Sequence, residues 1–590
     1  MWRLYLFCIK HKTFILDRLK HIVFSALLIS SGQILTAQNL NSPTELNRID
    51  KTLNESIYIS TNTSSYLTGE TLLYKVFCID NTTQSAKTQS KTAYIELVDS
   101  NKKSVFRHKI FLKDGTGNGD FFLPTTLESG NYKLIGYTKW MLNKDAENFF
   151  NIDLYILNPY KEIPNQTAVQ TENSATSTVA NNFISFDLKN KTYNSRQEVP
   201  LTIKTESDDF LNGKYSLSIR KTDGYVIQNK NGFVQTKDSR KDIVAASLKN
   251  NVLILPELRG ELITGKITSS SADIKNKKIA LSIVDKNSEL RFTKTDDQGR
   301  FIFNLDKSNS STNIIVQVIE DNKNEYTIEV DKDITADFSK LEFTNLQFNS
   351  DSKDNISERM VSSQIENAYY NVKKDSIVNI KDNVPFFGSL STEYVLDDYT
   401  RFKTMEETIT EIIKGVYFTK TKNNYSIHVP DNDTNYESTM PVLVTVDGLV
   451  IEDLNELFAY NPKKIEKVNV VSGLYYYGAN SFNGLLAYTT KEGNYDTKLK
   501  GRFITRPQLL RPEIKKEYFR PDYTKEKNDR IPDYRHQLLW NPNVNLKDQK
   551  LSFYTSDVSG KFEIVLEGFS ESGKSVFIKE FIDINEASSN

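Results

Sequence analysis

Runs in which apolar and polar residues alternate fill the first part of the chain, and glycine or asparagine turns separate them. Examples are residues 55–61 (ESIYIST), 71–79 (TLLYKVFCI), 93–99 (AYIELVD) and 130–138 (GNYKLIGYT). Alternation with period two predicts β-strands. In residues 93–99, Tyr94, Glu96 and Val98 should share one face and Ile95 and Leu97 the other, with one face buried and the other solvated. We expect an antiparallel β-sandwich over residues 42–160.

The strand pattern stops after residue 160. Residues 161–181 are small, polar and aperiodic, which is typical of a linker. Strand patterns return in residues 182–254, but two or three strands cannot close a sandwich. Residues 534–590 hold further strand patterns that also cannot stand alone. We therefore expect the two segments to form one discontinuous sandwich; the alternative is that each belongs to a separate small domain.

Between these two segments the pattern changes from strands to helices. Residues 255–335 again alternate. Within them a turn from Asp296 to Gly299 joins two strands, and Gly299 stands where the turn needs left-handed backbone geometry. Apolar residues then recur with helical spacing on one face: Ile356, Met360, Ile365, Ala368, Tyr369 and Val372. Thr404 and Glu407 predict the capping box of a second helix. Residues 350–495 are thus helical first and α+β afterwards, and residues 496–533 read as an extended connector.

The N-terminus indicates export. Basic residues in the first 20 positions precede an apolar run from 22 to 35, and Leu35-Thr36-Ala37 provides a small-residue cleavage site. This pattern predicts a signal peptide over residues 1–37. Removing it would take away five of 75 basic and one of 76 acidic residues, so the formal net charge would change from −1 to −5. No basic field would remain to bind nucleic acid or anionic lipid.

Residues with catalytic or metal-binding chemistry are scarce. Beyond the leader the sequence has three histidines, His108, His428 and His536, far apart in sequence, and one cysteine, Cys78. Motifs for zinc hydrolysis, nucleophilic serine or phosphate binding are not found. Cys78 lies in the strand pattern YKVFCID, which favours a buried core cysteine. We expect no enzyme activity, no catalytic residue, no metal site and no cofactor.

Three known domain types resemble parts of the chain. Residues 66–71 (YLTGET), 120–124 (DFFLP), 130–132 (GNY) and 137–141 (YTKWM) follow the order found in the macroglobulin MG2 domain. Residues 255–335 resemble the carboxypeptidase regulatory-like β-sandwich, which is structural in such proteins. The resemblance implies a mainly β, multi-domain fold: several immunoglobulin-like or macroglobulin-like β-sandwiches, with an α+β domain inserted.

The third resemblance is to the plug domain of TonB-dependent receptors of the Bacteroidota nutrient type. Its motifs match Asp447-Gly448, Asn461-Pro462, Ile465-Glu466, Tyr477-Gly478, Asn483-Gly484 and Thr489-Thr490. A receptor of that family closes around its plug with about 22 membrane strands of 9 to 11 residues. Only 100 residues follow Thr490 in this sequence. We therefore expect a plug-like domain without its own barrel.

These observations predict a non-enzymatic exported scaffold or accessory subunit of an outer-membrane protein complex. Its partner would be an outer-membrane barrel protein or envelope complex in trans, so contact with the membrane would be indirect, from the periplasmic or the cell-surface face. The alternative is a surface protein that binds glycans or peptides through sandwich loops. A macroglobulin-type protease inhibitor is disfavoured because Cys78 does not lie in a thioester motif.

The plug-like motifs supply the candidate contact residues. They are Asp447, Gly448, Tyr475, Tyr476, Tyr477, Gly478, Asn483 and Gly484. Turn geometry alone would also explain the glycines and an aspartate at the end of a strand. The three adjacent tyrosines are more informative, because successive side chains of a strand point to opposite faces. At least one of them must be exposed or covered by another chain.

Overall fold

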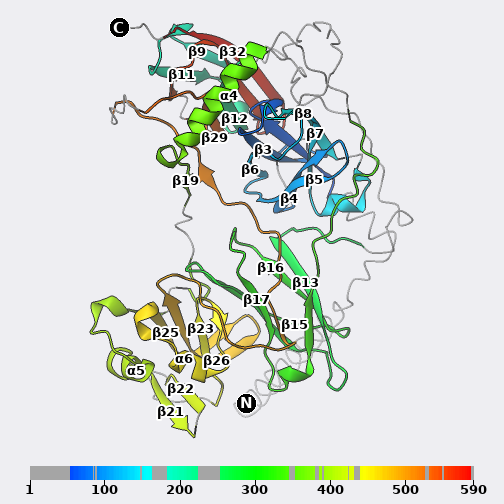
Figure 1. The fold of residues 1–590 in the computed structure, drawn as a ribbon. Coiled ribbons are helices and arrows are strands. Elements are labelled where there is room, and N and C mark those ends of the chain that lie inside the picture. The colour runs from blue at the N-terminus through cyan, green and yellow to red at the C-terminus, as the bar shows by residue number, and fades with distance from the viewer. Residues whose placement is uncertain are drawn as a thin grey trace, which may run out of the picture. The chain divides into compact units, whose positions relative to one another are not determined.

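The computed structural model describes thirteen stretches of the chain. They are residues 53–83, 85–86, 89–146, 149–161, 183–222, 253–343, 353–378, 384–388, 391–422, 424–430, 439–524, 531–547 and 550–586. The expected signal peptide and residues 162–181 of the expected linker lie outside them. Nearly all described residues belong to one compact unit, Glu55–Ser239 with Ile254–Asn590. The fold is mainly β and multi-domain, which confirms the expected class (Figure 1).

Residues 55–157 form the first sandwich, from sheets with the strand orders β1-β3-β6 and β2-β8-β7-β4-β5. The strands are β1 (Glu55–Thr61), β2 (Ser65–Leu67), β3 (Thr71–Asp80), β4 (Thr92–Asp99), β5 (Ser104–Phe111), β6 (Thr116–Phe122), β7 (Gly130–Tyr137) and β8 (Phe150–Leu157). Both sheets contribute to one core, which contains Tyr132 and Cys78. Cys78 is buried, as expected.

The expected solvated face of residues 93–99 is not present. Every residue of β4 from Thr92 to Val98 is buried. The second face is covered because Glu257, from the segment before the third sandwich, accepts hydrogen bonds from the hydroxyls of Thr92 and Tyr94, the latter over 3.1 Å. Alternation separates the two faces of a strand, but it does not show that a distant part of the same chain covers the second one.

Strands from residues 185–221 and from residues 537–584 combine in the second sandwich, with the orders β30-β11-β9 and β10-β32-β31-β12-β29. They are β9 (Ser185–Leu188), β10 (Thr192–Tyr193), β11 (Glu198–Lys204), β12 (Lys214–Lys221), β29 (Gln537–Val544), β30 (Lys550–Tyr554), β31 (Gly560–Phe569) and β32 (Ser575–Ile584), with the short helix α3 (Asp208–Leu211). Strand β12 lies between β29 and β31. This pairing agrees with the expected discontinuous sandwich.

The third sandwich has the orders β16-β13-β18 and β15-β14-β17-β27. Its strands are β13 (Glu261–Thr268), β14 (Lys278–Ile283), β15 (Glu289–Lys294), β16 (Arg300–Leu305), β17 (Ile314–Val318), β18 (Thr327–Val330) and β27 (Ile504–Thr505). Gly299 has a φ of 74° in the turn before β16, as the sequence predicts. Strand β27 comes from the expected connector and pairs with β17. The connector also supplies β28 (Lys516–Glu517), which pairs with β19 (Ser376–Ile377), so it is more than an extended linker.

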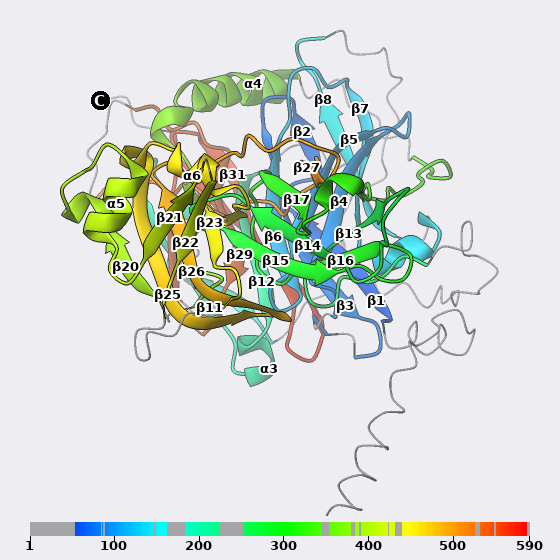
Figure 2. The ribbon, with the colours of Figure 1, turned by 90° about the horizontal axis from the view of Figure 1, so that it is seen from below.

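Residues 391–490 form an α+β module with one sheet, β20-β25-β26-β23-β24, and a separate hairpin, β21-β22. The elements are β20 (Thr392–Val395), α5 (Met405–Ile412), β21 (Tyr417–Thr421), β22 (Asn424–His428), β23 (Leu443–Val446), β24 (Leu449–Val450), α6 (Leu454–Phe458), β25 (Ile465–Tyr477) and β26 (Asn480–Thr490). Strands β25 and β26 form a long antiparallel hairpin (Figure 2). Helix α5 begins with the predicted capping box of Thr404 and Glu407.

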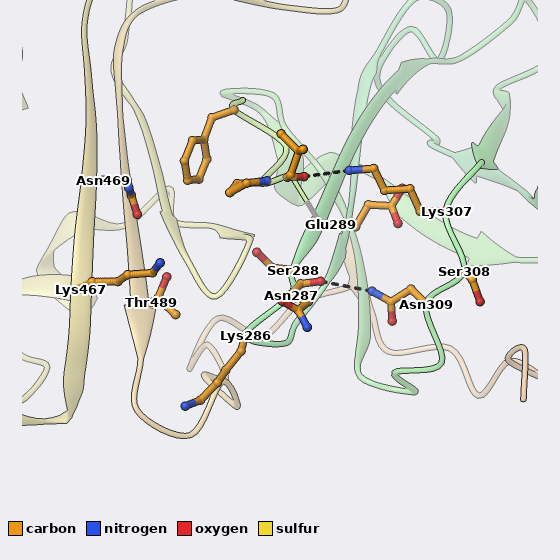
Figure 3. A pocket seen from close by; sticks show the side chains of 13 residues that line it. Lys286, Asn287, Ser288, Glu289, Lys307, Ser308, Asn309, Lys467, Asn469 and Thr489 are labelled. Carbon is orange, nitrogen blue, oxygen red and sulfur yellow. Dashed lines mark hydrogen bonds between the residues drawn. The ribbon is translucent and has the colours of Figure 1, made fainter. Parts of the chain in front are cut away.

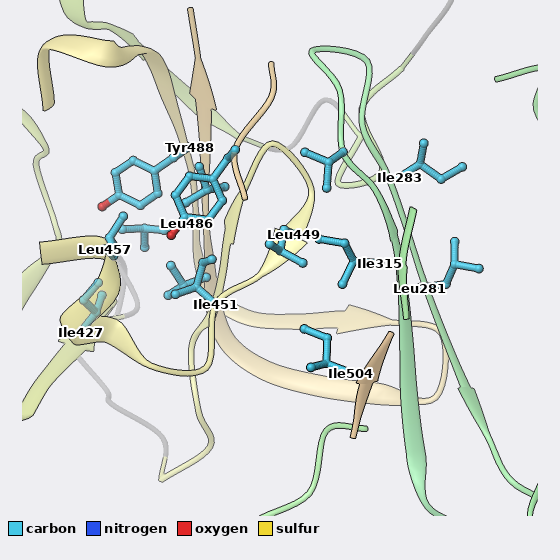
Figure 4. Close-up of a cluster of buried hydrophobic side chains, with 14 of the residues drawn as sticks. Leu281, Ile283, Ile315, Ile427, Leu449, Ile451, Leu457, Leu486, Tyr488 and Ile504 are labelled. Carbon is cyan, nitrogen blue, oxygen red and sulfur yellow. The ribbon is translucent and has the colours of Figure 1, made fainter. Parts of the chain in front are cut away.

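The α+β module shares its hydrophobic core with the third sandwich. Leu449 and Ile451 of the module belong to the same buried cluster as Ile315 of β17 and Ile504 of β27 (Figure 4). Core residues are close-packed and respond to small changes of volume. The module is therefore packed against the third sandwich as part of the same folded unit.

Helix α4 (Lys353–Ala368) buries only part of the apolar stripe that the sequence shows. Met360 does pack against the first sandwich, but Val372, in the turn after the helix, is exposed. The buried residues of α4 are the polar Arg359 and Ser362. The reason is that the surface beneath the helix carries a carboxylate, that of Glu70, which attracts the arginine.

Lys75 is buried where β3 of the first sandwich meets β29 of the second. Its Nζ donates hydrogen bonds to the carbonyl oxygen of Pro542 and to Oδ1 of Asn543, the latter over 3.0 Å. Burial, and next the charge of Lys214, lower the pKa of Lys75 to about 7. An unfolded lysine has a pKa of about 10.4. Between these values the unfolded chain binds a proton that the folded chain does not, so stability should rise with pH.

We expect this pH dependence to disappear in Lys75→Met. The free energy of unfolding of the unmodified protein, minus that of the variant, should rise by about 1 kcal/mol per pH unit between about pH 7.5 and 9.5. Urea unfolding of both proteins across this range measures the difference. Lys266→Met, which changes an exposed lysine paired with Glu329, is the control and should show no such slope. A constant difference for Lys75→Met would mean that Lys75 stays charged when buried.

Candidate functional site

Asp447 and Gly448 form the turn between β23 and β24, and both have positive φ, 48° and 81°. Asp447 is only 1% exposed, and its carboxylate accepts hydrogen bonds from the backbone N–H of Thr490 (2.7 Å) and of Tyr495 (3.0 Å). A Cβ at Gly448 would lie 2.5 Å from Cβ of Ser288. Both candidates are therefore held inside the chain, which contradicts a role as exposed contact residues and favours turn geometry.

Asn483 and Gly484 of β26 are buried as well. The backbone N–H of Asn483 donates to the carbonyl oxygen of Pro441 over 2.9 Å. Gly484 has a φ of 92°, and a Cβ there would lie 2.8 Å from Cβ of Val429. These two candidates maintain the strand and its neighbours, so they too are not exposed contact residues.

The three tyrosines of β25 divide between two environments, as the sequence requires. Tyr475 is buried, and Tyr477 is half-buried with its hydroxyl donating to the carbonyl oxygen of Leu290 over 2.5 Å. Burial raises the pKa of both phenols to about 12. Tyr476 is 67% exposed. Of the three, Tyr476 is the one whose ring is available to another molecule.

Two neighbours of Tyr476 complete an exposed surface at the end of the β25–β26 hairpin. Leu474, which sequence reasoning missed, is 48% exposed. Gly478 is exposed with a φ of 62°, and a Cβ there would meet no atom within 4 Å. We call Leu474, Tyr476 and Gly478 the hairpin tip. The alternation of Leu474 with Tyr475 was the signal that would have placed Leu474 beside Tyr476.

A cavity of about 130 Å³ lies between the third sandwich and the α+β module (Figure 3). Its polar lining comes from the β14–β15 turn, the segment after β16, and strands β25 and β26. These residues are Lys286, Asn287, Ser288, Glu289, Lys307, Ser308, Asn309, Lys467, Asn469 and Thr489. Val384, Pro385 and Phe387 form an apolar wall. Sequence reasoning missed this site because no local motif joins segments so far apart.

Glu289 is the buried acidic group of this cavity, with 4% of its surface exposed. Its Oε1 accepts hydrogen bonds from Nε (2.8 Å) and Nη2 (2.6 Å) of Arg291. Its Oε2 is buried and has no hydrogen-bond partner among the described atoms. Burial raises the pKa of Glu289, although the charge of Arg291 opposes the shift. Oε2 is therefore an unpaired oxygen enclosed beside the cavity.

Two further classes of site were considered in the part of the chain that the structure describes. There, no group of three or more His, Cys, Asp and Glu side chains is arranged to hold a metal ion. Within the same residues, no helix has the length and apolar character needed to cross a bilayer. The hairpin tip and the cavity are the two candidate sites considered below.

No protein-family model matches the chain. No curated protein matches it either. Among solved structures, it is similar to trypsin-activated α2-macroglobulin from Escherichia coli, with 8% identity, a TM-score of 0.16, and coverage of 91% of this chain and 24% of that one. It is also similar to Salmonella α2-macroglobulin reacted with methylamine, with 8% identity, a TM-score of 0.22, and coverage of 90% of this chain and 40% of that one.

An adhesin is also similar in structure. The Escherichia coli adhesin FdeC has 12% identity and a TM-score of 0.14, with coverage of 28% of this chain and 45% of that one. This chain therefore spans less than half the length of these three structures. TM-scores this low carry no argument about function, so the proposals below rest on the geometry of the chain itself.

Proposed function

We propose that this protein is a non-enzymatic exported scaffold, or an accessory subunit, of an outer-membrane protein complex. The hairpin tip carries the proposal. Tyr475 and Tyr477 already pack in the interior, whereas Leu474 and Tyr476 project into solvent with no role in the core. Exposed apolar side chains that cluster in this way mark sites of protein interaction. Because the surrounding stretch resembles a receptor plug, the proposed partner is an outer-membrane barrel protein or envelope complex in trans.

The proposed location is the outer membrane, on its periplasmic or its cell-surface face. The leader-like pattern of residues 1–37 supports export. The formal charge of −5 expected after its removal gives no basis for direct binding to anionic lipid or to nucleic acid. Membrane association would therefore be indirect, through the partner.

Buried ion pairs between modules support a scaffold role. Glu261 of β13 pairs with Lys109 of β5, with 2.7 Å between Oε1 and Nζ, and with Arg511 from the segment after β27. All three side chains are buried. Removing either cation by mutation would leave the carboxylate of Glu261 buried without its full complement of partners, which is strongly unfavourable. The modules are thus coupled, as a protein that positions a docking surface requires.

The double variant Leu474→Ser/Tyr476→Ser tests the docking surface. Buried aromatic residues at the centre of an interface contribute about 2 kcal/mol or more, so capture of the partner should fall by roughly 30-fold. A photo-crosslinking residue at Ser481, which pairs with Tyr476 across the hairpin, reports capture in intact cell envelopes. Thermal unfolding should change little, because surface substitutions usually alter stability by less than about 0.5 kcal/mol.

Tyr417→Ser is the matched control, because Tyr417 is an exposed aromatic residue on the other hairpin of the same module. It should leave capture unchanged. Equal capture by the double variant and the unmodified protein would remove the hairpin tip from the proposal. Recovery of the protein alone from crosslinked envelopes would contradict the scaffold function itself.

A second candidate function is binding of glycan or peptide at the cell surface through sandwich loops. The cavity of Figure 3 favours it, because the β14–β15 turn and the segment after β16 supply much of the polar lining. Ligand sites are commonly concave, with a few placed polar groups beside apolar walls. This candidate is independent of the hairpin tip, which lies at the end of the β25–β26 hairpin and contributes no residue to the lining.

A further inference from the structure

Helix α4 turns polar side chains inward and leaves apolar ones exposed. Its buried residues are Arg359 and Ser362. Val361 and Ala368 are exposed, and Ile365 between them is half-buried. Folded chains ordinarily do the reverse, because burying an apolar side chain is favourable and burying a charged one is costly. The exposed apolar side of α4 therefore indicates a surface that another molecule can cover.

The apolar residues on this side have the spacing of a helix–helix seam. Four of them recur at intervals of four, three and four positions, which is the a/d pattern of paired helices. We call these four residues the outer stripe: Val361, Ile365, Ala368 and Val372. Val372 lies in the single 3-10 turn that follows the helix, and it too is exposed. A second helix with the same spacing would fit the outer stripe.

Further exposed apolar residues follow at the C-terminal end of the outer stripe. They are Tyr369, Tyr370, Ile377 and Val378. Tyrosine is among the residues enriched at protein interfaces. Exposed apolar side chains that gather in one segment mark an interaction site, whereas single ones need no explanation.

The two ends of this surface carry opposite charges. Asp354 stands one heptad before Val361, and Lys374 follows Val372. Asp354 and Lys374 are exposed, and within the described residues neither forms an ion pair. Parallel pairing of two copies would bring like charges together at both ends, which is repulsive. Antiparallel pairing would instead set each Asp354 beside a Lys374.

A two-fold axis would satisfy both charges at once. Asp354 and Lys374 are each ten positions from Gln364, which is exposed on the helix. Rotation about an axis near Gln364 therefore exchanges the two ends of the surface and brings the outer stripe of one copy against that of the other. A surface that is complementary to itself in this way can close a symmetric dimer. A different partner would need both a matching stripe and matching charges, whereas a second copy supplies both.

We propose that the outer stripe joins two copies of this chain through antiparallel α4 helices. The contact is small, because α4 has 16 residues and is about 24 Å long. Such a pair buries less than the roughly 800 Å² per partner of a standard interface. The dimer should therefore be weak and reversible, with a dissociation constant of about 10–100 µM. It does not depend on the hairpin tip or the cavity, and it would give one assembly two hairpin tips.

Sedimentation equilibrium of the full chain, from about 1 to 300 µM, measures the self-association around the expected dissociation constant. We expect a reversible equilibrium between monomer and dimer. Val361→Glu places like charges within the seam and should weaken the dimer by at least about 30-fold. Ile302→Glu is the matched control, because Ile302 is 49% exposed against 48% for Val361 but lies on β16 of the third sandwich. The control should leave the equilibrium unchanged.

Charge reversal tests the antiparallel arrangement. Asp354→Lys and Lys374→Glu should each weaken the dimer by about 10-fold, because each sets like charges against one another at both ends of the pair. The double variant Asp354→Lys/Lys374→Glu should recover the strength of the unmodified dimer, since opposite charges meet again. Single variants that dimerise at full strength would contradict antiparallel pairing.

Three results would overturn the proposal. The first is a chain that stays monomeric at about 300 µM, well above the expected dissociation constant. The second is self-association that Val361→Glu does not weaken, because it would belong to another surface. The third is a monomeric chain in which hydrogen exchange of α4 slows only when outer-membrane extract is added, because the outer stripe would then belong to a different partner.

Discussion

Replacement of Arg359 by methionine is expected to lower the free energy of unfolding by about 3–5 kcal/mol, the usual cost of removing one partner from a buried ion pair. Nε and Nη2 of Arg359 contact the two carboxylate oxygens of Glu70 at 2.6 and 2.7 Å, and Nη2 also donates to the carbonyl oxygen of Ser65. This fork-shaped pairing is the strong form of an ion pair. Its loss would leave the carboxylate of Glu70 beneath helix α4 with the N–H of Leu67 at 2.9 Å and, as its charged neighbour, the more distant Arg220.

The pH dependence of Glu70 gives the same prediction a second readout. Burial alone would raise the pKa of Glu70, but the charges of Arg359 and Arg220 hold it below its usual value. A carboxylate with a lowered pKa in the folded state contributes stability above its unfolded pKa, and this contribution is lost as pH falls through the folded pKa. Arg359→Met should therefore have two effects. The free energy of unfolding at neutral pH should be lower, and its further decrease on acidification should be smaller.

Hydrogen exchange of the α4 amides, followed alongside urea unfolding, would show whether the helix detaches first. Val361→Ser alters the exposed opposite face of the same helix and should change stability by less than about 0.5 kcal/mol. The double variant Glu70→Gln/Arg359→Met should recover part of the loss, because the carboxylate that Arg359 neutralises is then absent as well. Unchanged stability of the single variant would mean that water, and not Arg359, satisfies Glu70.

Local signals in the sequence were sufficient for features that depend on neighbouring residues. The capping box of Thr404 and Glu407 is present because both partners lie within one helical turn. Gly299 adopts positive φ because its turn is determined by four consecutive residues. The pairing of residues 185–221 with residues 537–584 could be anticipated for a different reason, since neither segment has enough strands to close a sandwich.

Features that depend on contacts between distant segments could not be predicted. Helix α4 has an apolar stripe, yet its buried residues are Arg359 and Ser362, because the surface that the helix covers carries Glu70, which pairs with Arg359. Both faces of β4 are buried because Glu257 from another part of the chain covers the second one. Periodicity reports which residues share a face, and it does not report what lies opposite that face.

In the candidate sites too, features set by neighbouring residues could be predicted and features set by distant segments could not. Motif matching selected eight residues, and the structure leaves Tyr476 and Gly478 exposed while it places the others wholly or partly inside the fold. Leu474 was missed because it belongs to no motif. Glu289 was missed because its unusual property, a buried oxygen without a partner, arises only when three separate segments meet. Matched motif residues thus describe mainly how the α+β module folds, and the exposed residues between them are the ones that can meet a partner.

Asp447 is the motif residue whose replacement should have the largest effect on that fold. In Asp447→Ala we expect a loss of about 3–5 kcal/mol in the α+β module, because hydrogen bonds to a charged group contribute about 1.5–3 kcal/mol each and are not fully additive. The carboxylate accepts from N–H and Oγ1 of Thr490 at 2.7 and 2.6 Å and from N–H of Tyr495 at 3.0 Å. Alanine also tolerates the φ of 48° at this position less well than aspartate does.

The loss should be local, because Asp447 joins the β23–β24 turn to the end of β26 and to the segment that follows it. Hydrogen exchange should therefore increase first in residues 485–495, before the first sandwich is affected. Asp453→Ala is the matched control: Asp453 caps α6 by accepting from the N–H of Asn455 over 3.0 Å and is more exposed, so its loss should cost only about 1 kcal/mol. If the two variants are equally stable, the buried carboxylate is not what holds the end of β26. If instead Asp447→Ala keeps its stability but no longer captures the partner, Asp447 is a contact residue after all, and the assignment of docking to the hairpin tip fails.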